Sequence, residues 1–136
     1  MPHHHQVKVR FYELDPYGHL NHATYVQLFE TGRVELLEEA GIPLQEIERK
    51  GYRFLVSRIE TSFLRSVGAS AELIIETEVN EIRRVSSIWR QRLLSASEPV
   101  ATQVVRIGVV DEHERPVRFP DEMVTALMPY TTLEKA

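Results

Sequence analysis

The stretch from residue 21 to residue 41, NHATYVQLFETGRVELLEEAG, decides the fold of this chain of 136 residues. Its apolar positions recur at spacings of three and four residues: Tyr25, Phe29, Gly32, Leu36 and Ala40. That spacing is the period of an amphipathic helix. Asn21 is a favourable N-cap and Gly41 is suited to end a helix. The sequence therefore predicts a helix over residues 22–40, about 27 Å long at 1.5 Å per residue.

Strands are predicted on both sides of this helix. Before it, residues 7–12 alternate apolar and polar side chains, which is the period of a half-buried strand. Pro16 and Gly18 then mark a loop. After it, the patterns indicate a short helix at 43–50, strands at 52–63, 72–79, 88–94 and 100–110, a hairpin connection at 95–99, and a short helix from residue 120.

This order of elements predicts one α+β domain over residues 1–136, a five-stranded antiparallel sheet with one principal helix. Residues 1–5 are expected to be flexible. A single helix leaves part of such a sheet uncovered, and proteins usually cover such apolar surface and free strand edges by self-association. We therefore expect a homodimer or a homotetramer.

The composition of the chain excludes several classes of functional site. The chain has no cysteine, which excludes disulfides, thiolate metal sites and a cysteine nucleophile. A net charge of −4 gives no general surface for nucleic acid. No apolar run reaches the ~18 residues of a membrane span, and the N-terminus lacks the hydrophobic segment of a secretory signal. A cytoplasmic protein without a cofactor is expected.

The polar side chains concentrate in residues 15–25, DPYGHLNHATY. No G-x-S-x-G elbow and no glycine-rich phosphate loop competes with this segment. Asp15, His19 and His22 are residue types that bind metal ions, so a metal site is one alternative. A Ser-His-Asp relay is another, but no motif in the sequence places a serine for it. As purely structural residues, Asp15 suits a turn, Asn21 a helix cap, and Tyr25 a core position.

A third chemistry uses the helix itself. The first amides of the helix, at residues 22–24, lack intrahelical acceptors and lie at the positive end of the helix dipole. They are suited to hold a carbonyl oxygen that becomes an oxyanion. A carboxylate at Asp15 would attack that carbonyl or activate a water. Because a carboxylate is a weak nucleophile, an activated acyl group such as a thioester is favoured.

Residues 9–25, VRFYELDPYGHLNHATY, together with Glu30 and Arg33, resemble the opening of the 4-hydroxybenzoyl-CoA thioesterase-like branch of the hotdog fold. The later stretches FLR at 63–65 and RPVRFP at 115–120 are similar to that family as well. The resemblance implies a long helix wrapped by an antiparallel sheet, dimers formed through the sheets, and acyl-CoA thioesterase sites at the subunit seam.

The resemblance also implies roles for individual residues. Asp15 takes the position of the catalytic carboxylate, as nucleophile or general base, and the backbone amide of His22 polarises the thioester carbonyl. His19 would orient the loop or a water. Asn21 would aim the helix amides by capping the helix, and Tyr25 would line the acyl pocket.

Coenzyme A, part of the substrate and not a cofactor, carries phosphates that need cations. The resemblance implies a basic turn reached from the partner subunit, which Arg83 and Arg84 fit, and Arg65 is a second candidate. Residues 66–71, SVGASA, depart from the family, where a Pro-Ala and a Gly-Asp are frequent. The departure leaves the acyl group open, whether aromatic or aliphatic.

Three rival functions fit the same fold. One is a non-catalytic acyl-CoA-binding or sensor module, and another is a thioesterase acting on acyl carrier protein. The third is a dehydratase that uses His22 as its base. Release of free thiol from an acyl-CoA separates the first rival from an enzyme.

Overall fold

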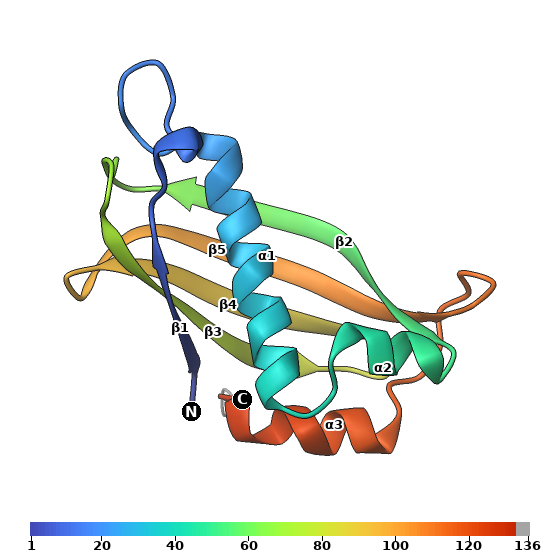
Figure 1. Cartoon of the computed structure of the whole chain (residues 1–136). Coiled ribbons are helices and arrows are strands. Elements are labelled where there is room, and N and C mark those ends of the chain that lie inside the picture. The colour runs from blue at the N-terminus through green and yellow to red at the C-terminus, as the bar shows by residue number, and fades with distance from the viewer. Residues whose placement is uncertain (133–136) are drawn as a thin grey trace.

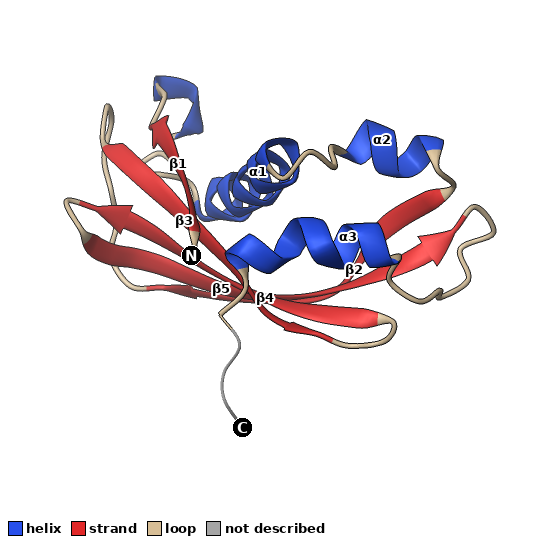
Figure 2. Cartoon of the chain, turned by 90° about the horizontal axis from the view of Figure 1, so that it is seen from below, coloured by secondary structure: helices blue, strands red, loops and turns tan. Residues whose placement is uncertain are grey.

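Five antiparallel strands form one sheet, and the α-helices lie together on one of its faces (Figures 1 and 2). The computed structural model describes residues 1–132. The strands are β1 (His3–Lys8), β2 (Tyr52–Phe63), β3 (Glu72–Ile82), β4 (Ser86–Ser95) and β5 (Glu98–Asp111), and the helices are α1 (His22–Glu39), α2 (Leu44–Arg49) and α3 (Asp121–Leu127). The sheet order is β1-β3-β4-β5-β2. The predicted α+β fold with one long helix is confirmed.

The first strand lies earlier in the chain than predicted. The strand expected at 7–12 is right only for Val7 and Lys8, because β1 begins at His3 and ends at Lys8. His3, His4 and His5, which were expected to be flexible, form the first half of β1. Their partners are glutamates from distant elements: His3 Nε2 lies 2.6 Å from Glu39, His4 Nε2 3.0 Å from Glu76, and His5 Nδ1 4.0 Å from Glu35. Pairing with α1 and β3 therefore holds the N-terminus in the sheet.

The segment after β1 is a single 3₁₀ turn, Phe11–Glu13, and not a strand. The Arg10 amide donates to Glu13 Oε1 at 2.7 Å, which closes the turn. Phe11, expected on the buried side of the strand, is 84% exposed. The alternating pattern was therefore misleading here, because local hydrogen bonds replace the ladder.

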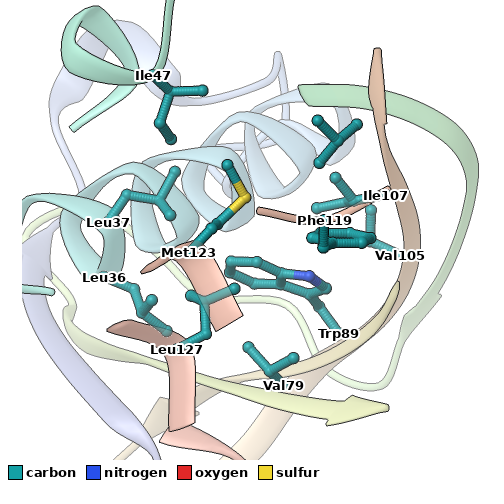
Figure 3. Close-up of a cluster of buried hydrophobic side chains, with 11 residues drawn as sticks. Leu36, Leu37, Ile47, Val79, Trp89, Val105, Ile107, Phe119, Met123 and Leu127 are labelled. Atoms are coloured by element: carbon teal, nitrogen blue, oxygen red, sulfur yellow. The ribbon is translucent and has the colours of Figure 1, made fainter. Parts of the chain in front are cut away.

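The core has two parts, one under each half of α1. Under the C-terminal half, Leu36 and Leu37 pack with Trp89 and with Met123 and Leu127 of α3 (Figure 3). Under the N-terminal half, the buried cluster comprises Val9, Leu20, Tyr25, Phe29, Val67, Leu73, Ile75, Leu93, Val100 and Ala101. The two clusters fix α1 against the sheet, and with it the position of the first turn of α1.

Gly32 lies where α1 packs tightly against β3 and β4. A Cβ at this position would overlap Ile75 Cγ2 and lie 3.0 Å from Thr77 Oγ1. We expect Gly32→Ala to destabilise the protein by about 1–3 kcal/mol, because overpacking outweighs the better helix propensity of alanine. Urea denaturation measures the change, with the exposed Gln27→Ala as the control. A variant more stable than the wild type would contradict the close packing.

The open edge of β2 leaves apolar surface uncovered. Within residues 1–132, β2 pairs with β5 alone, and α1 packs mainly against β1 and β3. The side chains of β2 that point toward the helix side, as their register with buried β5 residues shows, form a surface we call the β2 inner face: Val56, Ile59, Thr61 and Phe63. Its three apolar members remain 41–49% exposed. The leftover apolar surface expected from the sequence is thus present.

None of the helices within residues 1–132 combines the length and the apolar character that crossing a lipid bilayer requires.

Candidate active site

The loop before α1 is closed by its own backbone and projects beyond the first turn of the helix (Figure 1). The Asp15 amide donates to the His19 carbonyl at 2.7 Å, and the Gly18 amide donates to the Asp15 carbonyl at 3.0 Å. Gly18 has a φ of +78°, which a glycine adopts without strain. The Leu20 amide donates to the Val67 carbonyl at 2.8 Å and anchors the loop to the segment before β3.

The Asp15 carboxylate is held by one of its two oxygens. Oδ1 accepts the backbone N–H groups of Tyr17 at 2.9 Å and of His19 at 3.1 Å. Oδ2 accepts no hydrogen bond from any residue in the range 1–132. The half-buried side chain is therefore oriented and keeps one oxygen for another group.

The first turn of α1 offers one free amide. Asn21 caps the helix as predicted, since its Oδ1 accepts the Ala23 amide at 2.9 Å. The Thr24 and Tyr25 amides donate to the Asn21 carbonyl at 2.9 and 3.4 Å. The His22 amide has no acceptor within the described chain. Of the amides expected to be free at residues 22–24, only that of His22 is free, and it lies at the positive end of the helix dipole.

Phe63, at the end of β2, joins the helix tip to the sheet edge. Its ring meets the His22 ring edge-on at 6.3 Å and the Tyr25 ring edge-on at 5.3 Å between centroids. Half of Phe63 is exposed, so it presents an apolar surface beside the free His22 amide. Phe63 is not among the site residues predicted from the sequence, because only the fold brings residue 63 next to residue 22.

Tyr25 is buried in the core beneath the helix tip. Its hydroxyl donates to the Arg65 carbonyl at 3.1 Å. Burial raises the pKa of the Tyr25 hydroxyl, and the negative charge of nearby Asp15 acts in the same direction. Tyr25 is therefore a core residue next to the site, and its ring packs edge-on against the exposed ring of Phe63.

His19 and His22 are both exposed, but they serve the loop and the helix tip in different ways. The His19 backbone holds Asp15, and His19 also bridges to Gly68. The His22 ring instead packs edge-on against the ring of Phe63. Within residues 1–132 no three histidine, cysteine, aspartate or glutamate side chains gather as a metal-ligand set, so these residues are not arranged as one.

The predicted phosphate-binding arginines lie at two different ends of the sheet. Arg65 follows β2 and is close to the site through Tyr25, with its guanidinium 3.7 Å from Glu98. Arg83 and Arg84 lie in the turn after β3, a strand of 11 residues, which is about 36 Å at 3.3 Å per residue. The loop of Asp15 is anchored at the opposite end of β3, so one chain does not bring Asp15 and this turn together.

The turn after β3 borders a hollow of its own. Arg83, Arg84 and Arg118 line a depression of about 740 Å³ between this turn and α3. Arg83 is paired with Glu81 at 2.6 Å, whereas Arg84 forms no ion pair with a described residue. Arg118 adds a cation that the sequence reasoning did not single out, because the chain separates it from the turn by more than thirty residues.

The sequence of this chain is similar to those of known proteins. Residues 9–127 match the family model of the thioesterase-like superfamily. The chain is 28% identical over 120 residues to an acyl-acyl carrier protein thioesterase, ATL2, of Arabidopsis thaliana, which covers 87% of this chain and 64% of that protein. It is 28% identical over 122 residues to the acyl-CoA thioesterase YbgC of Haemophilus influenzae, covering 88% of this chain and 90% of that protein.

Solved structures share the fold. A probable thioesterase from Bartonella henselae superposes with a TM-score of 0.83 at 27% identity, covering 88% of this chain and all of that one. The protein SAV2348 of Staphylococcus aureus, solved in complex with CoA, superposes with a TM-score of 0.90 at 16% identity, covering 100% and 89% of the two chains, which shows the common fold.

The chain spans 64% and 63% of the length of the two Arabidopsis relatives, and 90% of the length of the Haemophilus one. The family model covers most of the chain and includes the Asp15 loop, the helix tip and β2. The sequence match, the five-stranded antiparallel sheet and the long helix α1 therefore agree, and the chain belongs to the thioesterase-like superfamily.

Proposed function

We propose that this protein hydrolyses acyl-CoA thioesters to the free acid and coenzyme A. The observation that carries the proposal is the combination of an oriented carboxylate in the loop before α1 with a free amide in the first turn of α1. Asp15 keeps Oδ2 unoccupied by residues 1–132, and the His22 amide points from the positive end of α1. The name of the Haemophilus relative supports hydrolysis of acyl-CoA thioesters, and the name of the Bartonella structure, a probable thioesterase, supports thioester hydrolysis in general.

In the proposed reaction the His22 amide donates to the thioester oxygen as that oxygen gains negative charge. Asp15 takes a proton from water while the hydroxide oxygen bonds to the carbonyl carbon. The carbon–sulfur bond then breaks, and the coenzyme A thiolate leaves and takes up a proton. In the nucleophilic alternative, an Asp15 oxygen bonds to the carbonyl carbon, the carbon–sulfur bond breaks, and the coenzyme A thiolate leaves and takes up a proton. Water then cleaves the resulting mixed anhydride to the free acid and restores the Asp15 carboxylate.

We further propose that the site is completed by a second copy of the chain through the open edge of β2. The free backbone groups of an edge strand and the apolar β2 inner face favour strand pairing between copies. Such a dimer would allow Arg83 and Arg84 of one copy to approach the Asp15 site of the other. The proposed reaction takes place in the cytoplasm, the compartment expected from the sequence.

If the turn after β3 binds the coenzyme A phosphates, Arg83→Ala combined with Arg84→Ala will raise KM for an acyl-CoA. We expect an increase of about tenfold with kcat within about threefold, because phosphate contacts far from the carbonyl contribute equally to ground state and transition state. Thiol release over a range of substrate concentrations measures both constants. Arg90→Ala, an exposed arginine on the helix-free face, is the control. An unchanged KM would contradict the assignment.

A second candidate function is hydrolysis of thioesters carried by acyl carrier protein, which the name of the Arabidopsis relatives favours. The two functions differ in whether the carrier or the nucleotide of coenzyme A contributes to recognition. Rates with one acyl group on coenzyme A, on acyl carrier protein and on free pantetheine separate them. Binding of acyl-CoA without thiol release would favour the sensor function instead.

A further inference from the structure

Arg33 is a buried cation in the middle of α1. Its side chain is only 6% exposed. Nη1 donates to Gln91 Oε1 and to Gln103 Oε1, each at 2.8 Å. Both glutamine side chains are oriented by their own amide donors, Gln91 toward the Phe29 carbonyl and Gln103 toward the Thr61 hydroxyl. The two oriented glutamine side chains of the sheet therefore hold the guanidinium in one position.

This cation has no anionic partner within residues 1–132. No aspartate or glutamate of the described chain lies within 4.0 Å of the Arg33 guanidinium nitrogens. Glu30, one turn earlier on α1, is exposed and acts only at longer range. Burial lowers the pKa of Arg33, and Glu30 acts in the opposite direction. Burying a charge without a partner is unfavourable, so an acceptor from outside the described chain would stabilise it.

The remaining donors of Arg33 face accessible space. Nε and Nη2 donate to no residue of the described chain, yet the fully buried side-chain atoms without a partner there are only His3 Nδ1 and Asn80 Oδ1. Arg33 also lines a cavity of about 190 Å³ between α1 and β2. Glu30 lies at the wall of this cavity as well, and the rest of its lining is apolar: Val34, Leu37, Leu44, Phe54, Val56, Trp89 and Ile107, of which Leu37, Trp89 and Ile107 are labelled in Figure 3.

This cavity lies at the far end of the β2 inner face. Val56 belongs to both, and the inner face continues along β2 to Phe63, which contacts the His22 ring. Arg33 lies eleven residues after His22 on the same helix, about 16 Å along the axis. An extended acyl chain spans that distance with roughly twelve carbons, given C–C bonds of ~1.5 Å.

Building on the proposed thioesterase activity, we propose that Arg33 binds an oxygen at the far end of the acyl group. The substrates would then be thioesters of medium-length chains that end in a hydroxyl or a carboxylate. Either group accepts hydrogen bonds from the free guanidinium donors and relieves the unpaired buried charge. A plain alkyl end would close the cavity over those donors and leave them unsatisfied, which is unfavourable.

The test compares three coenzyme A thioesters of equal length: dodecanoyl-CoA, 12-hydroxydodecanoyl-CoA and the monothioester of dodecanedioic acid. We expect kcat/KM to be at least about tenfold higher for one or both oxygen-ended substrates than for dodecanoyl-CoA. In Arg33→Met that ratio should fall to about one. Arg49→Met, which removes an exposed arginine of α2, should keep the wild-type ratio.

Equal rates for the three substrates in the wild type would overturn the inference, whether or not Arg33→Met folds. A folded Arg33→Met that keeps the preference would overturn it as well, and would assign Arg33 to packing alone. If no thioester is cleaved, the proposed hydrolysis fails, and binding of the free acids decides about Arg33. Dodecanedioic acid binding more tightly than dodecanoic acid, only when Arg33 is present, supports the inference; equal affinities overturn it.

Discussion

Replacing Asp15 with asparagine is expected to lower kcat for acyl-CoA hydrolysis by at least about a hundredfold, the scale of a lost general base or nucleophile. Asparagine keeps an Oδ1 that accepts the Tyr17 and His19 amides, so the loop is expected to retain its shape. What the substitution removes is the negative charge of the proposed base or nucleophile. Thiol release under saturating acyl-CoA measures the loss, and circular dichroism confirms the fold.

The chain contains a closely matched control for this substitution. Asp111 closes a turn with the same hydrogen-bond pattern, since its Oδ1 accepts the His113 amide at 2.8 Å and the Arg115 amide at 3.0 Å. Asp111→Asn should leave kcat within about twofold, because Asp111 lies far from the helix tip. Turnover of Asp15→Asn within a few fold of the wild type would refute the proposed mechanism. An equal loss in Asp111→Asn would show that turn stability, and not charge, sets the rate.

A second large effect is expected at the open edge of β2. Ile59 is 41% exposed on the β2 inner face, and Ile59→Asp would bury an unpaired charge if copies of the chain pair through this edge. The dissociation constant of the dimer should rise by about a hundredfold or more, given ~3–5 kcal/mol for such a charge. Activity should fall together with the dimer, because the proposed site needs residues from two copies. Sedimentation velocity and thiol release measure the two losses.

Val85 provides the comparison for Ile59. It is also 41% exposed, but it lies in the turn after β3, away from the β2 edge. Val85→Asp should leave the sedimentation coefficient unchanged. A monomeric and active wild type, or a dimer that tolerates Ile59→Asp, would show that copies of the chain do not associate through β2.

The elements predicted best from the sequence are those whose signals lie within a few residues. The long helix begins at His22 as predicted, because the Asn21 cap and the apolar period act locally. The limits of β2, Tyr52 and Phe63, also agree with the prediction. The first strand was misplaced because its partners, Glu35 and Glu39 on α1 and Glu76 on β3, come from parts of the chain far from the histidines.

Some features of the candidate site are likewise predictable from local sequence, and others depend on contacts between distant parts of the chain. The local sequence is enough to predict that Asp15 occupies a turn directly before a capped helix, because the turn and the cap are made by hydrogen bonds within about ten residues. Three other placements follow from the folded chain alone. Phe63 lies against His22, and Arg83 and Arg84 lie a full strand away from Asp15. The Arg33 guanidinium is buried against Gln91 and Gln103. Such placements depend on strand register and on how α1 packs on the sheet, and long-range packing of this kind leaves no local pattern in the sequence.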